Sequence, residues 1–144
     1  MGEVRSVEEY WQEHVERSLR SLHVVPTADP GVESMVDSYA DGRKGKIRAR
    51  AWFNDDAYLD IVEDVEITDR PHRRRYSYQF MIEDSPAIRW HYEPLYAEPI
   101  RYHIDRPGEG HVPDEWRSLA QCADECWHIL AEHTDVTSIA PDPG

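Results

Sequence analysis

Apolar and polar residues alternate one by one through most of the chain between residues 32 and 105. A period of two is typical of β-strands that bury one face and expose the other. The alternation predicts five strands and a less regular sixth, at residues 32–39, 47–53, 58–67, 75–82, 87–92 and 100–105. Their connections are short and rich in Asp, Asn, Gly and Pro, whereas a parallel crossover needs about a dozen residues or more. We therefore expect neighbouring strands to form an antiparallel meander.

Two segments of helical periodicity flank these strands. Residues 7–22 place apolar side chains on one stripe, and Ser6 with Glu9 forms a capping box at the start. A Pro-containing connector at residues 26–31 follows this helix. A second helix is predicted at residues 114–133, and its apolar stripe consists of Trp116, Leu119, Ala123, Cys126, Trp127 and Leu130.

The order of these elements predicts a single α+β domain over residues 1–134. An antiparallel sheet of five to six strands is expected to pack one face against the N-terminal and the C-terminal helix. Residues 135–144 are expected to form a flexible, acidic and Pro-containing tail. The length of 144 residues is ordinary for one domain.

The charge of the chain is large but unevenly distributed. The sequence has 29 Asp and Glu against 16 Lys and Arg, a net charge of −13. Arginine supplies 14 of the basic residues, which indicates adaptation to strong salt or a GC-rich genome. Residues 41–111 contain 12 basic and 14 acidic residues, a net charge of only −2. No apolar run is long enough to span a membrane, and the first residues are charged, so we expect a cytoplasmic protein.

The outward-facing positions of several strands carry Arg and His. These positions are Arg48, Arg50, Arg75, Arg89, His91, Arg101 and His103. If the strand registers agree, these side chains form one basic surface on one face of the sheet. The same arginines would alternatively pair with cross-strand carboxylates, such as Asp60, Asp64 and Glu66, and serve only as surface charges.

One carboxylate breaks the apolar face of the strand at residues 58–67. Glu63 falls on the same side as Leu59, Ile61 and Val65. A carboxylate there is costly unless it is paired, and burial would raise its pKa. Glu63 is therefore a candidate acid or base. A β-bulge that turns it outward, or a position at the sheet edge, would explain it equally well.

Histidine spacing favours chemistry without a metal. Helical H-x-x-x-H and strand H-x-H patterns are missing from the sequence. His91 and His103 lie on two strands that we expect to be neighbours, where they would act as base and acid beside an arginine. Cys122 and Cys126 are one helical turn apart, which is typical of packing, although a zinc site with two histidines stays open.

Short motifs between Lys46 and Glu109 resemble those of the TumE-type toxins of prokaryotic toxin–antitoxin pairs. The matching stretches are KIRARAWFNDDAYLDIVEDVEI, RRRYSYQF, IRWHYEP and HIDRPGE. Position by position, the matches are Asp55, Leu59, Glu63, Arg75, Tyr76, Tyr78, Arg89 and His103. The sequence departs from the family pattern where Asp56 replaces a hairpin glycine and where Trp90-His91-Tyr92 replaces an aromatic-Asp pair.

This resemblance implies a toxin that acts on RNA or on the translation apparatus, as an endoribonuclease or otherwise, and that a cognate antitoxin inhibits. No cofactor or metal is expected. The candidate site residues are the phosphate-binding Arg75, Arg89 and Arg101, the base-stacking Tyr76 or Tyr78, the acid and base His91 and His103, and Glu63 to orient or activate one of them. A non-catalytic protein–protein interaction module with the same fold is the main alternative. A small-molecule enzyme with a cleft around Trp52, Trp90 and Tyr92 is a third hypothesis.

Overall fold

The computed structural model describes residues 4–139. The chain begins with a continuous helical stretch that contains a central π-helix. Its parts are α1 (Val7–Tyr10), η1 (Trp11–Glu16) and α2 (Arg17–Ser21). Ser6 caps the stretch, because its hydroxyl accepts a hydrogen bond from the backbone N–H of Glu9 at 3.1 Å.

Eight strands within the described residues form one antiparallel sheet. They are β1 (Val25–Ala28), β2 (Val36–Tyr39), β3 (Lys44–Trp52), β4 (Ala57–Ile67), β5 (Pro71–Ile82), β6 (Ser85–Tyr92), β7 (Tyr102–Asp105) and β8 (Val112–Pro113). The order across the sheet is β1-β3-β4-β5-β6-β7-β8, and β2 pairs with the same edge of β3 as β1. From β3 to β8 each strand therefore pairs with the next strand in sequence, as a meander requires.

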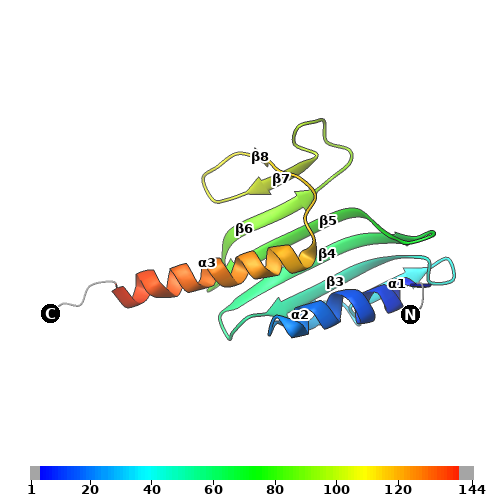
Figure 1. Ribbon diagram of the computed structural model, residues 1–144, viewed down its shortest axis with the longest axis horizontal. Coiled ribbons are helices and arrows are strands. Elements are labelled where there is room, and N and C mark those ends of the chain that lie inside the picture. Colours follow the sequence, from blue (N-terminus) through cyan, green and yellow to red (C-terminus); the bar gives the residue numbers. More distant parts are fainter. Residues whose placement is uncertain (1–3, 140–144) are drawn as a thin grey trace.

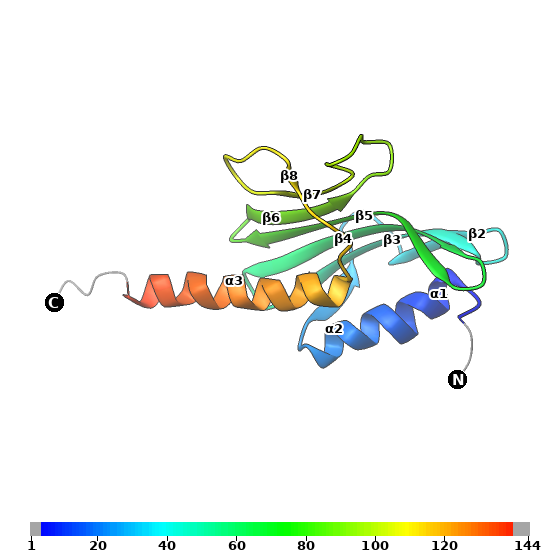
Figure 2. The same ribbon diagram turned by 45° about the horizontal axis from the view of Figure 1, so that its top comes forward.

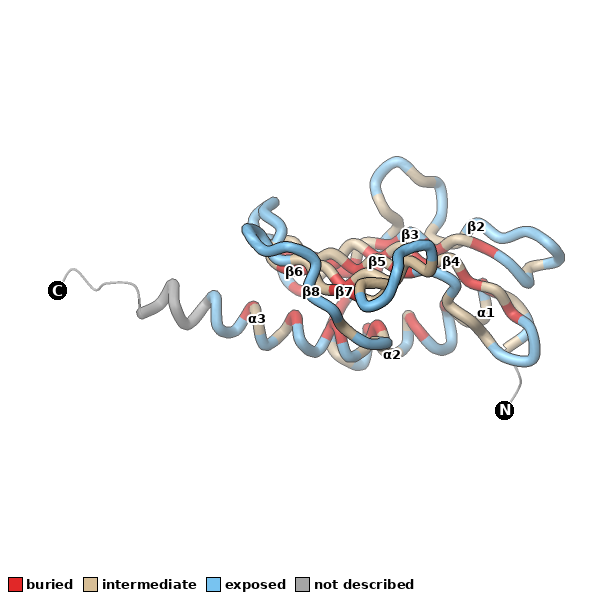
Figure 3. Tube along the Cα trace, turned by 90° about the horizontal axis from the view of Figure 1, so that it is seen from above, coloured by how far each residue is buried: buried red, intermediate tan, exposed pale blue. Residues whose placement is uncertain are grey.

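The helical stretch and α3 (Leu119–Ile139) lie on the same face of the sheet (Figures 1 and 2). They are joined directly, because the indole Nε1 of Trp127 donates a hydrogen bond to the backbone carbonyl of Leu22 at 2.8 Å. We call this side of the sheet the helix face and the opposite side the open face. Buried residues follow the strands and the helix surfaces turned toward them, whereas the loops around the sheet are exposed (Figure 3).

The core lies between the helix face and these helices. Trp11 and Leu19 enter it from the N-terminal stretch, and Cys126 enters it from α3. The inward positions of β4 and β5, including Ile61 and Phe80, complete it. The predicted α+β fold, with an antiparallel sheet and a helix at either end of the chain, is thereby confirmed.

Element boundaries differ from the prediction in several places, most clearly at the two ends of the sheet region. Residues 25–28 form strand β1 and not a connector, because its edge position tolerates Pro26. The C-terminal helix begins at Leu119, after Ser118 caps the backbone N–H of Gln121 at 3.0 Å, and continues to Ile139. Residues 140–144 of the predicted tail lie outside the described residues.

The short strand β8 was not predicted, and it pairs with β7 at one end of the sheet. Among residues 4–139, no helix combines the length and the apolar character needed to cross a membrane.

The burial of the helix face predicts where the sheet is sensitive to cavities. Leu59 is fully buried in the middle strands, so Leu59→Ala should lower the free energy of unfolding by about 2–5 kcal/mol in urea titrations. Val62→Ala, on the open face of the same strand, should lower the free energy of unfolding clearly less, because Val62 is only half-buried. Equal losses for the two variants would contradict the assignment of the core to the helix face.

Candidate functional site

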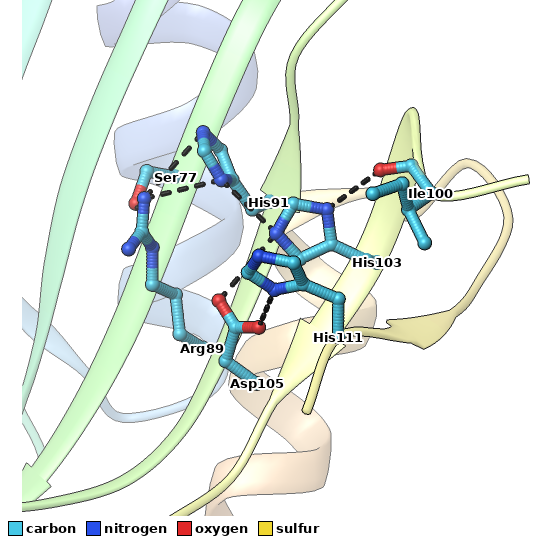
Figure 4. A network of polar contacts seen from close by, with 7 residues as sticks. All are labelled: Ser77, Arg89, His91, Ile100, His103, Asp105 and His111. Carbon is cyan, nitrogen blue, oxygen red and sulfur yellow. Dashed lines mark hydrogen bonds and ion pairs between the residues drawn. The ribbon is translucent and has the colours of Figure 1, made fainter. Parts of the chain in front are cut away.

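Strands β6 and β7 bring Arg and His together on the open face. Their antiparallel register places His91 opposite His103 and Arg89 opposite Asp105. His111, from the loop before β8, joins them (Figure 4). We call these five residues the open-face cluster. The alternation of the strands predicted that Arg89, His91 and His103 share this face, and the register brings them into contact.

The guanidinium group of Arg89 is held against the sheet. Its Nε donates a hydrogen bond to Oγ of Ser77 on β5 at 3.0 Å. Its Nη2 lies 3.1 Å from Nδ1 of His91. Because a guanidinium only donates, Nδ1 of His91 accepts this bond and the proton of the neutral ring resides on Nε2.

His103 is the buried centre of the cluster, with 1% of its surface exposed. Its Nδ1 donates to the carbonyl oxygen of Ile100 at 2.7 Å, and its Nε2 lies 3.3 Å from Nδ1 of His91. The single lone pair of His91 Nδ1 thus faces both the Arg89 guanidinium and Nε2 of His103. Oδ2 of Asp105 also lies 3.5 Å from Nε2 of His103.

Asp105 also fixes the exposed ring of His111. Nδ1 of His111 lies 2.5 Å from Oδ1 of Asp105, so the carboxylate selects the tautomer with the proton on Nδ1. The Nε2 lone pair of His111 is then available, on a side chain that is 48% exposed. The His111 and Tyr96 rings pack against His103, with centroids 4.3 and 5.5 Å away, and cover it.

The environment of His91 keeps its imidazole uncharged at neutral pH. Partial burial, the Arg89 guanidinium and His103 lower its pKa to about 4. Asp105 acts in the opposite direction but is the weaker influence. The cluster therefore places a neutral imidazole in contact with a second imidazole that has a carboxylate beside it, an arrangement suited to proton transfer.

The same atoms are the only group in the described part of the chain spaced for a metal. His91, His103 and Asp105 each offer one ligand atom within 4.8 Å of the others. The Arg89 guanidinium, however, already occupies the His91 lone pair that a cation would need, and its charge would repel the cation. The donor set as it stands therefore fits proton transfer better than metal binding.

Two other predicted phosphate ligands lie near the cluster but are engaged by acids. Arg75 pairs with Glu93 at 3.2 Å. Arg101 precedes β7 and donates to the carbonyl of Tyr96 at 3.0 Å, while it pairs with Glu98 at 3.3 Å. Arg101 therefore supports the loop that carries Tyr96 over His103.

Glu63 lies on the helix face, on the other side of the sheet from the histidines. It is fully buried and accepts hydrogen bonds from the hydroxyl of Tyr10, at 2.8 Å, and from the hydroxyl of Tyr78. Burial raises the pKa of Glu63, although Arg73 and the two tyrosine donors partly offset this effect. Glu63 cannot orient His91 or His103 directly, contrary to the role expected from the sequence.

A β-bulge supplies the cation next to Glu63. The β4–β5 register shifts between Asp64 and Val65, so that Arg73 and not Arg74 stands opposite Val65 on the helix face. Nη1 of Arg73 donates to the Tyr78 hydroxyl at 2.7 Å. The bulge considered for this region therefore exists, but it turns an arginine inward and leaves Glu63 buried.

The remaining sequence candidates do not form sites. Tyr76 and Tyr78 are buried on the helix face, so neither is exposed to stack a base. Cys122 and Cys126 are buried, burial raises the pKa of both thiols, and neither joins a metal-spaced group among the described side chains.

The aromatic cleft of the third hypothesis does not form either. Trp52 lies on the open face beside Tyr58, whereas Trp90 and Tyr92 are on inward positions of β6.

Sequence reasoning missed Asp105 and His111 as functional residues of the cluster, and Ser77 and Tyr96 as side chains that contact it. Asp105 and His111 carry a weak signal, since an acid and a His flank the turn after the strand that contains His103. Tyr96 carries none, because only the loop conformation brings it onto His103.

This geometry defines a small α+β protein in which the helices cover one face of an antiparallel sheet and the other face carries a cluster of His, Arg and Asp side chains. The family model described as "Toxin TumE" matches residues 27–134, so the chain belongs to the TumE toxin family. The match confirms the resemblance and includes the whole open-face cluster and Glu63. No curated protein and no solved structure gave a match.

The low pKa of His91 can be measured directly. In two-dimensional ¹H–¹⁵N spectra of its ring, His91 should titrate at about pH 4. Arg89→Met should raise that pKa, because it removes a neighbouring positive charge while the ring stays partly buried. An unchanged midpoint in Arg89→Met would show that Arg89 does not act on His91.

Glu63 should make stability depend on pH. Because burial raises its pKa, the folded chain retains this proton at pH values where the unfolded chain has lost it. The corresponding stabilisation is complete below the unfolded pKa and is lost as the pH rises through the folded pKa. In urea titrations, the free energy of unfolding of Glu63→Gln should not show this decline as the pH rises. The prediction is wrong if the free energies of variant and wild type fall in parallel with pH.

Proposed function

We propose that this TumE-family toxin acts on RNA through the open-face cluster, by metal-independent acid–base cleavage. The observation that carries the proposal is the unbroken chain of contacts from Arg89 through His91, His103 and Asp105 to His111. It supplies an anion-binding guanidinium, a proton acceptor and a proton donor on one surface. We further propose that the toxin acts in the cytoplasm and that a cognate antitoxin inhibits it.

The hydrogen-bond pattern supports one choice of base and acid. Nε2 of His111 is the free lone pair, so it removes the proton of a ribose 2′-hydroxyl, and Asp105 stabilises the imidazolium that forms. The 2′-oxygen attacks phosphorus, and Arg89 leaves His91 to bind the phosphate oxygens. Compared with the roles expected from the sequence, His111 takes the place of His91 as the base.

His91 delivers the second proton. In this proposal His103 starts the step with a proton on each ring nitrogen. The Nε2–H of His91 protonates the departing 5′-oxygen, while Nδ1 of His91 receives the proton of Nε2 of His103, 3.3 Å away. His103 thereby remains the acid, but it acts through His91 because its own ring is buried. The products are a 2′,3′-cyclic phosphate and a 5′-hydroxyl, with His111 protonated and His103 neutral.

The non-catalytic interaction module makes a different prediction. In that case the same basic surface would bind an acidic partner, and growth arrest on expression would not depend on any imidazole. Elsewhere on the open face, arginines form ion pairs with carboxylates, such as Arg50 with Asp60 at 2.9 Å. Parts of this surface therefore carry only paired surface charges.

The cleavage test uses purified protein and a short single-stranded RNA at neutral pH. His91→Ala and His111→Ala should each lower the cleavage rate by about 10²–10⁴-fold, as loss of a general acid or base does. His128→Ala is the matched control, because His128 is an exposed histidine on α3 outside the cluster. A 2′-deoxy nucleotide at the cleaved position should block the reaction, and EDTA should not.

Three results would refute the proposal. One is an absence of cleavage by the wild type, and another is equal cleavage by wild type and both cluster variants. Loss of activity in EDTA that added divalent metal restores would contradict the metal-independent mechanism. If His91→Ala and His111→Ala still arrest growth, the interaction module is the better explanation.

A further inference from the structure

A cleft of about 620 Å³ opens on the helix face, on the side of the sheet away from the open-face cluster. It lies between the N-terminal helical stretch, the start of β5 and the segment that leads into α3. Inward side chains of β6 and β7, Tyr92 and Tyr102, form part of its wall. This volume falls within the range of small-molecule sites, about 300–1,000 Å³.

The charge of this cleft is opposite to that of the chain. No Asp or Glu is found among the described residues that line it, although the sequence contains 29. Arg70, Arg73 and Arg74 line it instead, and Arg74 pairs outward with Glu66 at 2.8 Å. Among the side chains that the structure describes, neither Arg70 nor Arg73 forms an ion pair with a carboxylate. An acid-free basic cleft in an acidic chain favours an anionic ligand.

Flat aromatic surfaces accompany these cations. Trp116 is 57% exposed at the cleft, and the guanidinium carbon of Arg73 lies 4.7 Å from the centroid of the Trp116 ring. Tyr92 and Tyr102 stack on each other at 4.3 Å with their planes 10° apart. An exposed indole offers a planar ligand a stacking surface that an acidic peptide would not use.

Arg73 is held in place before any ligand arrives. Its two terminal nitrogens donate to the Tyr78 hydroxyl at 2.7 Å and to the backbone carbonyl of Arg117 at 2.6 Å. A guanidinium has five donors, so these two bonds leave others for an anion. Preorganisation of this kind lowers the entropic cost of binding.

From these observations we infer that the cleft binds a nucleotide, with its base stacked on Trp116 and its phosphate held by Arg70 and Arg73. The nucleotide is either free or the terminal unit of an RNA strand. This site does not depend on the proposed function, because it shares no residue with the open-face cluster.

Calorimetric titration of the full chain with AMP, GMP, CMP and UMP tests the site. Saturable binding is expected, with adenosine and inorganic phosphate each much weaker than AMP. Trp116→Ala and Arg70→Gln should each weaken binding about tenfold, the usual effect of losing one stacked ring or one charged contact. Both positions are exposed, so neither substitution should disturb folding. The matched controls, Tyr39→Ala and Arg43→Gln, change exposed residues outside the cleft and should bind like the wild type.

A 5′-phosphorylated five-nucleotide RNA, titrated into His91→Ala, separates the two sources of the ligand. Tighter binding of the RNA than of AMP assigns the site to a strand end, and the reverse assigns it to a free nucleotide. The inference is overturned if no nucleotide binds saturably, if phosphate alone binds as tightly as AMP, or if Trp116→Ala keeps full affinity. It is also overturned if an acidic peptide binds and nucleotides do not. Each result is independent of RNA cleavage, since binding alone is measured.

Discussion

The buried carboxyl group of Glu63 is the constraint around which the helix face is arranged. A carboxyl group with no exposed surface costs several kcal/mol unless donors replace its water. The donors come from two distant parts of the chain, Tyr10 in α1 and Tyr78 in β5. The N-terminal helix is thereby tied to the middle of the sheet at one orientation. The bulge that brings Arg73 to Tyr78 belongs to the same arrangement, because it supplies a positive charge next to the buried acid.

Because side chains alternate along β6 and β7, these two strands carry one set of side chains on the open face and a different set on the helix face. His91 and His103 point to the open face, while their sequence neighbours Tyr92 and Tyr102 point into the cleft of the helix face. The two sites therefore share a backbone but no side chain. A substitution in one of them reports on that site alone, provided that the strand pairing is kept.

The alternation made the fold and part of the cluster predictable. Because the inward residues of each strand are apolar, only one register buries them, and this register fixes the side on which Arg89 and His91 lie. The partner of Glu63 was not predictable, since Tyr10 is 53 residues away and on a helix. Nor was Arg73, because three arginines in succession do not reveal which one a bulge turns inward. The role of His111 depends on a loop that returns to Asp105, and alternation says nothing about loops.

The net charge of −13 places a limit on how this protein can recognise an anion. At physiological ionic strength the Debye length is about 8 Å, so acidic side chains elsewhere act only weakly on a ligand within a site. Attraction over longer distances is unavailable, because the chain as a whole repels phosphate. Affinity must then come from contacts at short range: Arg89 held by Ser77 on one face, and Arg73 held by Tyr78 beside Trp116 on the other. Both guanidinium groups donate the hydrogen bonds that fix them to neutral acceptors, and among the described side chains neither group forms a salt bridge with a carboxylate.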